Sequence, residues 1–163
     1  MSYYVAQICQ NGHIITDTYN SSGKKKGEHF CRKCGEKTIT KCPECNTNIR
    51  GRWVTSWQST GEFRRLVGTP IFCHHCGVSY PWTIRNEDAA KELISTLTEL
   101  SEKDRQQLSD DLPDLISESP RTEVVANKFR LTIGKLSGMM KDLLYNLTVD
   151  IASETAKKII KDE

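Results

Sequence analysis

The sequence lacks any long apolar run. No segment approaches the roughly 20 consecutive apolar residues that a membrane-spanning helix needs, and no apolar run of the signal-peptide kind follows Met1. We therefore expect a soluble, cytoplasmic protein without a membrane span. At 163 residues the chain has room for one ordinary domain or two small ones.

The residue patterns of common catalytic sites are also missing. The sequence contains no H-E-x-x-H or H-x-E…P-C-x-x-C pattern of zinc enzymes, no G-x-S-x-G nucleophile elbow and no GxxxxGK[ST] phosphate loop. These absences favour a protein that is not an enzyme.

Cysteine is confined to the first half of the chain. All seven cysteines lie between Cys9 and Cys76, and six of them form three C-x-x-C pairs. An odd count cannot pair fully within one chain, and this spacing is typical of metal-binding knuckles in a reducing compartment rather than of a disulfide framework.

Charge follows the same division. Residues 1–85 carry 12 Lys and Arg against 5 Asp and Glu, whereas residues 86–163 carry 11 against 16. We expect an α+β protein with a tandem zinc-ribbon domain of short antiparallel β-hairpins at 1–85. A small α-helical domain at 86–163 is expected to serve interaction or oligomerisation.

Two C-x-x-C pairs predict one complete zinc site. A structural zinc ion takes four nitrogen or sulfur ligands in a tetrahedron, and the 27 residues between these pairs are enough for a β-hairpin. The predicted ligands of this site are Cys42, Cys45, Cys73 and Cys76.

The remaining pair, Cys31 and Cys34, needs two further ligands, and only Cys9 is left among the cysteines. His13 completes the set in the run C-Q-N-G-H, where the glycine permits the turn that directs the imidazole toward the metal. His29 is the rival fourth ligand, but a residue in the strand approaching Cys31 points less favourably. Both sites then have four protein ligands and are structural rather than catalytic.

The pairing of the knuckles has two solutions. Sequential pairing joins Cys9 and His13 to the Cys31 pair, whereas cross-bracing joins them to Cys42 and Cys45. We favour sequential pairing, because short connections predominate in proteins.

The N-terminal half resembles a known group of proteins. The run QICQNGHIIT…FCRKCGEKTITKCPECNTNIRG…FCHHCGVSYPWT is similar to an uncharacterised bacterial family of double zinc-ribbon proteins with a domain of unknown function. The similarity covers residues 5 to about 90, and none of the eight ligands departs from the pattern. The resemblance implies two zinc sites and brings no established activity.

Residues 46–72 combine basic and aromatic side chains. They predict two strands around a turn at residues 59–62. Such a surface can pack internally, bind a protein partner, or hold phosphates and stack bases. Its candidate residues are Arg50, Arg52, Trp53, Trp57, Arg64 and Arg65.

From Asn86 onward the apolar pattern has a helical period, with Asn86 as the predicted N-cap. Ser101 resembles a capping residue for a short helix at 102–109. Pro113 and Pro120 are expected in the first turns of helices. A long amphipathic pattern covers 121–161, with a break expected near its glycines, Gly134 and Gly138.

The sequence thus predicts a non-catalytic zinc-binding adaptor or scaffold with two structural zinc ions. Its C-terminal helices would bind a protein partner, either a second copy of the chain or another protein. The alternative is a zinc-ribbon protein that binds nucleic acid through the basic and aromatic hairpin.

Overall fold

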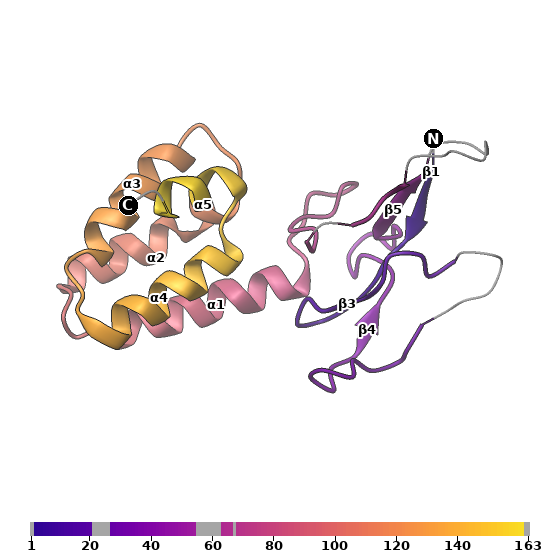
Figure 1. Cartoon of the computed structure of the whole chain (residues 1–163), viewed down its shortest axis with the longest axis horizontal. Helices are drawn as coiled ribbons and strands as arrows, with labels where there is room; N and C mark the ends of the chain where they lie inside the picture. The colour runs from indigo at the N-terminus through magenta and orange to yellow at the C-terminus, as the bar shows by residue number, and fades with distance from the viewer. Residues whose placement is uncertain (1, 21–26, 55–62, 67, 162–163) are drawn as a thin grey trace. The chain divides into compact units, whose positions relative to one another are not determined.

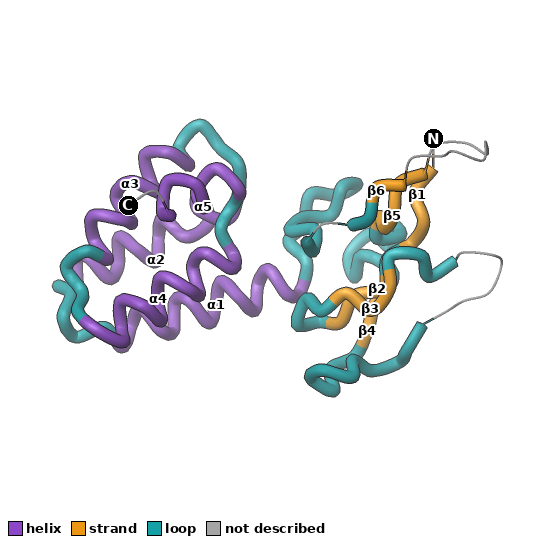
Figure 2. Tube along the Cα trace, viewed as in Figure 1, coloured by secondary structure: helices purple, strands orange, loops and turns teal. Residues whose placement is uncertain are grey.

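Short strands and tight turns make up the N-terminal part of the chain, and helices make up the C-terminal part (Figures 1 and 2). This arrangement, seen in a computed structural model, confirms the predicted α+β class. The structure describes residues 2–20, 27–54, 63–66 and 68–161. The chain forms two compact units, Met1–Ile84 and Arg85–Glu163.

Within the described residues, unit 1 contains two antiparallel sheets of three strands each. One sheet has the strand order β3-β2-β4, with β2 in the centre. The other sheet has the order β1-β5-β6, with β5 in the centre. The strands are β1 (Ser2–Val5), β2 (Gln7–Cys9), β3 (Ile14–Thr16), β4 (Thr38–Ile39), β5 (Arg50–Val54) and β6 (Phe63–Arg64).

The hydrophobic core of unit 1 is small and includes two cysteines of the predicted zinc sites. It consists of Ala6, Ile8, Cys42, Ile49, Cys73, Tyr80 and Trp82, all nearly inaccessible to solvent. A core of this size supplies little burial free energy, so a unit of this kind depends on other links for its stability.

Helix α1 (Pro81–Thr96) begins before Asn86, so the predicted N-cap was wrong. Proline fits the first position of a helix, where its missing N–H costs nothing. The next residues anchor this first turn in unit 1: the indole N–H of Trp82 donates to the carbonyl of Pro70 (2.8 Å), and the hydroxyl of Thr83 donates to that of Ile71 (2.9 Å). The division between the two units falls within α1.

In unit 2, α3 packs against α2, α4 and α5, and α4 also packs against α5. The helices that follow α1 are α2 (Glu102–Ile116), α3 (Thr122–Ile133), α4 (Gly138–Ile151) and α5 (Glu154–Lys161). No helix in the described part of the chain combines the length and the apolar character of a membrane span.

In unit 2 the start of α2 and the break before α4 were predicted correctly, but other predictions were wrong. Helix α2 runs to Ile116 instead of ending at residue 109, and Pro120 precedes α3 instead of lying in its first turn. Ser101 caps α2, accepting a hydrogen bond from the backbone N–H of Asp104 (3.1 Å), and the chain breaks between Gly134 and Gly138. Pro113, however, lies inside α2 rather than in a first turn. Burial of the apolar face formed by Leu108, Leu112, Leu115 and Ile116 offsets the lost helical hydrogen bond.

Candidate metal centres

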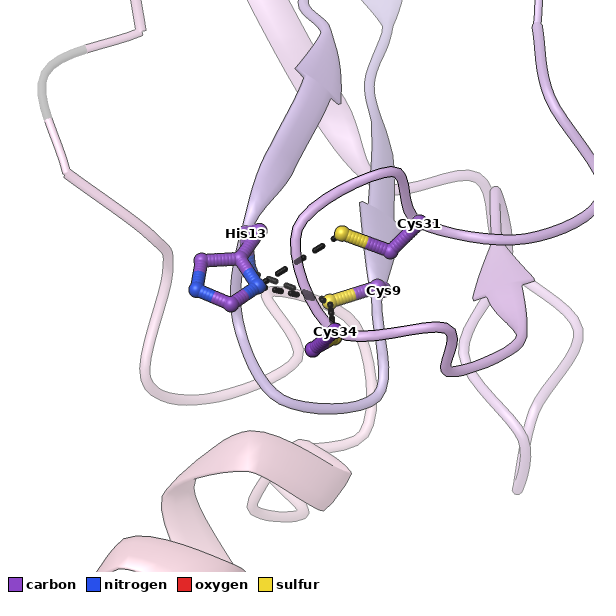
Figure 3. A group of neighbouring side chains, drawn as sticks. All are labelled: Cys9, His13, Cys31 and Cys34. Atoms are coloured by element: carbon purple, nitrogen blue, oxygen red, sulfur yellow. Dashed lines mark hydrogen bonds between the residues drawn. The ribbon is translucent and has the colours of Figure 1, made fainter.

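Four predicted ligands come together in unit 1 around the end of β2. The Nδ1 atom of His13 lies 3.5 Å from the sulfur of Cys9 and 3.5 Å from that of Cys31, and the sulfurs of Cys9 and Cys34 are 3.7 Å apart. Figure 3 shows the imidazole directed at the three sulfurs. The donor atoms of this group all lie within 4.8 Å of one another, so the group could hold a metal ion.

A second group consists only of cysteines. The sulfurs of Cys42 and Cys76 are 3.8 Å apart, and those of Cys45 and Cys73 are 3.7 Å apart. In each group two ligand residues are buried, one is intermediate and one is exposed. Each metal would therefore lie at the edge of the core rather than in open solvent.

The structure groups the ligands sequentially. Cys9 and His13 join the Cys31 pair, and the second group is formed without them. His29 belongs to neither group, although it lies within the part of the chain that the structure describes. The cross-braced arrangement is therefore not the one the chain adopts.

The three C-x-x-C knuckles share one pattern of backbone hydrogen bonds. In each C-x-x-C knuckle the backbone N–H of the first cysteine donates to the carbonyl of the residue five positions later. The backbone N–H of the residue that follows the second cysteine donates to the carbonyl of the first cysteine. That residue has a positive φ, which glycine and asparagine tolerate best. The three residues are Gly35 (71°), Asn46 (58°) and Gly77 (74°). The repeated C-x-x-C-G/N pattern was a signal that the sequence interpretation did not use.

The segment from Cys9 to His13, which supplies the other two donors of the first group, has a different turn. Gly12 has φ of 86° and donates to the carbonyl of Cys9 (2.8 Å), while the N–H of His13 donates to the Cys9 sulfur (3.3 Å). A side chain at Gly12 would also meet the Cβ of Trp82 at 3.2 Å. This position therefore requires glycine both for its backbone angle and for the space.

The spacing of the donors fits a tetrahedral metal of the size of zinc. Zn–S bonds of about 2.3 Å place two sulfur ligands about 3.8 Å apart, and a nitrogen ligand lies about 3.5 to 3.6 Å from each sulfur. The S···S distances of 3.7 to 3.8 Å and the N···S distances of 3.5 Å agree with these values. Cysteine and histidine donors in such a geometry are typical of structural zinc.

The electrostatics of the second group favour a bound cation. Hydrogen bonds from the hydroxyl and the backbone of Thr47 lower the pKa of Cys45 to about 6. The pKa of Cys76 is raised to about 12: the backbone of Val78 lowers it, but burial and the neighbouring sulfurs outweigh that hydrogen bond. Four sulfurs this close cannot all ionise without a positive charge between them, and a divalent metal supplies that charge.

Two residues that support the groups were missed by the sequence interpretation. Tyr80 is 1% exposed and hydrogen-bonds to the sulfur of Cys73, and burial together with the nearby sulfurs raises the pKa of its phenol. The buried amide of Gln7 donates to the carbonyl of Glu28 (2.8 Å) and accepts from its N–H (3.0 Å), which fastens the segment leading to the first knuckle onto β2. Such partners orient the ligands of a metal.

The structure describes four side chains of the predicted basic and aromatic surface, and their surroundings differ. Arg50 is exposed and lies over the ring of Tyr3, whereas Arg52 forms an ion pair with Asp17. Trp53 is half-buried and pairs with both Tyr3 and Arg64 in the register of the sheet. Arg65 is exposed, and Trp57 lies outside the described residues.

Two four-donor groups on cysteine knuckles, joined to a helical unit, define a double metal-ribbon protein. The chain belongs to the family described as uncharacterized protein conserved in bacteria (DUF2321), whose profile matches residues 2–160. The match extends beyond the residues 5 to 90 that carried the resemblance, so both units belong to the family. No curated protein and no solved structure matches the chain.

Proposed function

We propose that each group holds one structural zinc ion and that the protein is a non-catalytic adaptor, which binds a partner protein through its helical unit. Four protein donors per site fill the tetrahedron and leave no position for a reacting water or substrate. The zinc ions then maintain the fold of unit 1 instead of performing chemistry.

A structural role for the metals is supported by the core of unit 1. Cys42 and Cys73 are themselves core residues, two of the seven buried members of this cluster among the described residues. Zinc binding by preformed cysteine knuckles supplies folding free energy that such a core lacks. Loss of either metal is therefore expected to unfold at least part of this unit.

The observation that carries the adaptor function is an apolar surface on α4. Met139 is 80% exposed and Leu143 is 50% exposed, while Met140 and Leu147 are half-buried. Spacings of three and four residues place these side chains along one face of the helix, which we call the α4 stripe. Exposed methionine and leucine side chains on a helix are typical of surfaces that bind other proteins.

A charge-reversal experiment tests the adaptor function. The double variant Met139→Asp/Leu143→Asp places two carboxylates on the α4 stripe at positions that are already exposed, so the fold should be retained. The control is Lys128→Glu on α3, an exposed position where one substitution changes the net charge by the same two units. Leu147→Asp is a poorer probe, because Leu147 is half-buried.

Association is measured in two ways. Light scattering after gel filtration reports self-association, and a photo-cross-linker at the exposed position 146 of α4, in the native cell, reports other proteins. The proposal predicts a dimer or a discrete protein adduct that is lost in the double variant and retained in Lys128→Glu. A monomer without adducts, or adducts that both variants retain equally, would show the adaptor function to be wrong.

A further inference from the structure

The side chains of Tyr3 and Arg50 form a stacked pair on the surface of unit 1. The guanidinium carbon of Arg50 lies 4.8 Å from the centroid of the Tyr3 ring. Arg50 is exposed, and Tyr3 remains 48% exposed although the guanidinium covers part of it. The pair joins β1 to the first residue of the central strand β5.

Stacking on Tyr3 does not itself occupy the hydrogen-bonding edge of Arg50. A guanidinium that lies on an aromatic face uses its π surface for that contact, and its five N–H donors point outward in the plane. The ring also limits the rotamers of the arginine, so less conformational entropy is lost when the donors bind. A planar fork held in this way suits the two oxygens of a phosphate.

The surroundings distinguish Arg50 from the neighbouring arginine. Arg52 is neutralised by Asp17, whereas no acidic side chain in the described part of the chain forms a salt bridge with Arg50. Among the described residues, therefore, no carboxylate neutralises the cation at Arg50.

Aromatic surface continues beside the pair. Tyr3 lies opposite Trp53 in the register of β1 and β5, and directly opposed residues in a sheet project to the same face. Trp53 is half-buried, so part of its surface remains accessible. An exposed cation next to two accessible aromatic rings on one sheet is the combination that single-stranded nucleic acids require.

The charge of the unit is compatible with a polyanion. Residues 1–85 carry 12 basic and 5 acidic side chains. With seven ionised cysteines and two zinc ions included, the net charge is about +4. A polyanionic strand is therefore attracted to unit 1 as a whole, and the Tyr3–Arg50 pair supplies the local contact.

We propose that this surface binds single-stranded nucleic acid, with Arg50 donating two hydrogen bonds to a backbone phosphate and the Tyr3–Trp53 surface stacking an adjacent base. Tyr3 is a positioning residue for Arg50 as well as part of the stacking surface. The aromatic component favours a nucleic acid over an acidic protein, because a carboxylate needs the cation but no stacking platform.

Fluorescence anisotropy of the full, zinc-loaded chain tests the proposal. The probes are labelled DNA and RNA single strands of about 15 nucleotides and a duplex of the same length, titrated between about 50 and 200 mM salt. We expect the single strands to bind in preference to the duplex. Arg50→Ala should weaken binding about tenfold and reduce the salt slope by about 0.7, the loss of one phosphate contact.

Variants of the same pair separate charge from geometry. Arg50→Lys keeps the charge and should retain the salt slope while losing part of the affinity, because lysine lacks the planar fork. Tyr3→Ala should weaken binding, and Tyr3→Phe should restore it, because the ring and not the hydroxyl positions Arg50. The matched control is Arg32→Ala, which removes one positive charge from the same unit at a cation already paired with Glu28.

All variants are checked for two bound zinc ions, so that unfolding is not mistaken for lost contact. Absence of binding at the lowest salt would overturn the proposal, as would equal binding by Arg50→Ala, Tyr3→Ala and Arg32→Ala. Displacement of the strand by polyglutamate as effectively as by unlabelled oligonucleotide would also overturn it in favour of a general acidic partner. The Met139→Asp/Leu143→Asp variant should bind normally, so this proposal and the adaptor function can fail independently.

Discussion

The guanidinium of Arg52 forms two hydrogen bonds with the carboxylate of Asp17: Nε lies 3.2 Å from Oδ2, and Nη2 lies 3.1 Å from Oδ1. The backbone carbonyl of Asp17 also accepts from the N–H of Arg52 (2.8 Å). This contact links the segment after β3, in one sheet, to β5, in the other. Arg52 therefore connects the two sheets of unit 1.

Removal of this link should destabilise unit 1. Asp17→Ala leaves a half-buried guanidinium without its partner, and we expect the free energy of unfolding to fall by about 1–2 kcal/mol. Denaturant titration at a fixed free zinc concentration measures the change. Arg32→Ala, which breaks the ion pair of an 86% exposed arginine, should cost less than about 0.5 kcal/mol. Equal losses in the two variants would contradict the structural role of Asp17.

Metal analysis of the purified protein should find two zinc ions per chain, one for each four-donor group. His13→Ala removes one of four ligands, so the zinc content should fall to one per chain. His29→Ala should retain both ions, because His29 belongs to neither group. A content of two in His13→Ala and one in His29→Ala would mean that the fourth ligand has been misassigned.

Release of zinc should depend on pH through the thiolates. The pKa of Cys45 is lowered from 9.0 to about 6 by Thr47, so its ionised form stabilises the folded unit fully above pH 9.0, and this contribution is lost as the pH falls toward 6. Zinc binding has the same sign, because each ligand must give up a proton. Thr47→Val should therefore move the midpoint of zinc release to higher pH.

A colorimetric chelator that reports free zinc during acid titration measures this midpoint. Thr96→Val, at an exposed position in α1, serves as the control and should leave it unchanged. An unshifted midpoint in Thr47→Val would show that the hydrogen bonds from Thr47 do not support the Cys45 thiolate.

Tyr80→Phe should weaken the second site without abolishing it. The phenol is 1% exposed and hydrogen-bonds to Cys73, so its removal leaves that sulfur with one donor fewer in a buried place. Loss of such an outer partner typically lowers metal affinity by about 10- to 100-fold. In competition with a chelator of known affinity, one of the two zinc ions should be released more readily than in the wild type. Tyr145→Phe, at a half-buried position in α4, should release both ions as the wild type does.

Several features of this protein could be predicted from local sequence alone. The three C-x-x-C pairs mark the knuckles because two cysteines at that spacing, with a turn between them, bring two sulfurs to one point by backbone geometry. Ser101 marks the start of α2 and the pair Gly134 and Gly138 marks the break after α3 for equally local reasons, since capping and backbone freedom act within one turn. The change of composition near residue 85 likewise predicted the α+β class.

Other features depend on contacts between distant segments and needed the tertiary structure. Which knuckles pair was decided by the path of the chain between them, because sequential and cross-braced pairing use the same residues. Pro81 rather than Asn86 begins α1 because Trp82 is anchored in the core of unit 1.

The two arginines of β5 show most clearly the difference between what the local sequence predicts and what the tertiary structure decides. Arg50 and Arg52 carry the same charge and flank the same residue, Gly51, so the local sequence does not distinguish their roles. The fold places Arg52 against Asp17 and leaves Arg50 on the ring of Tyr3. The sequence by itself determined the eight residues that could bind metal and the fold class, because these follow from short-range spacing and composition. Only the tertiary structure decided which cation is available to a partner, because that depends on residues far away along the chain.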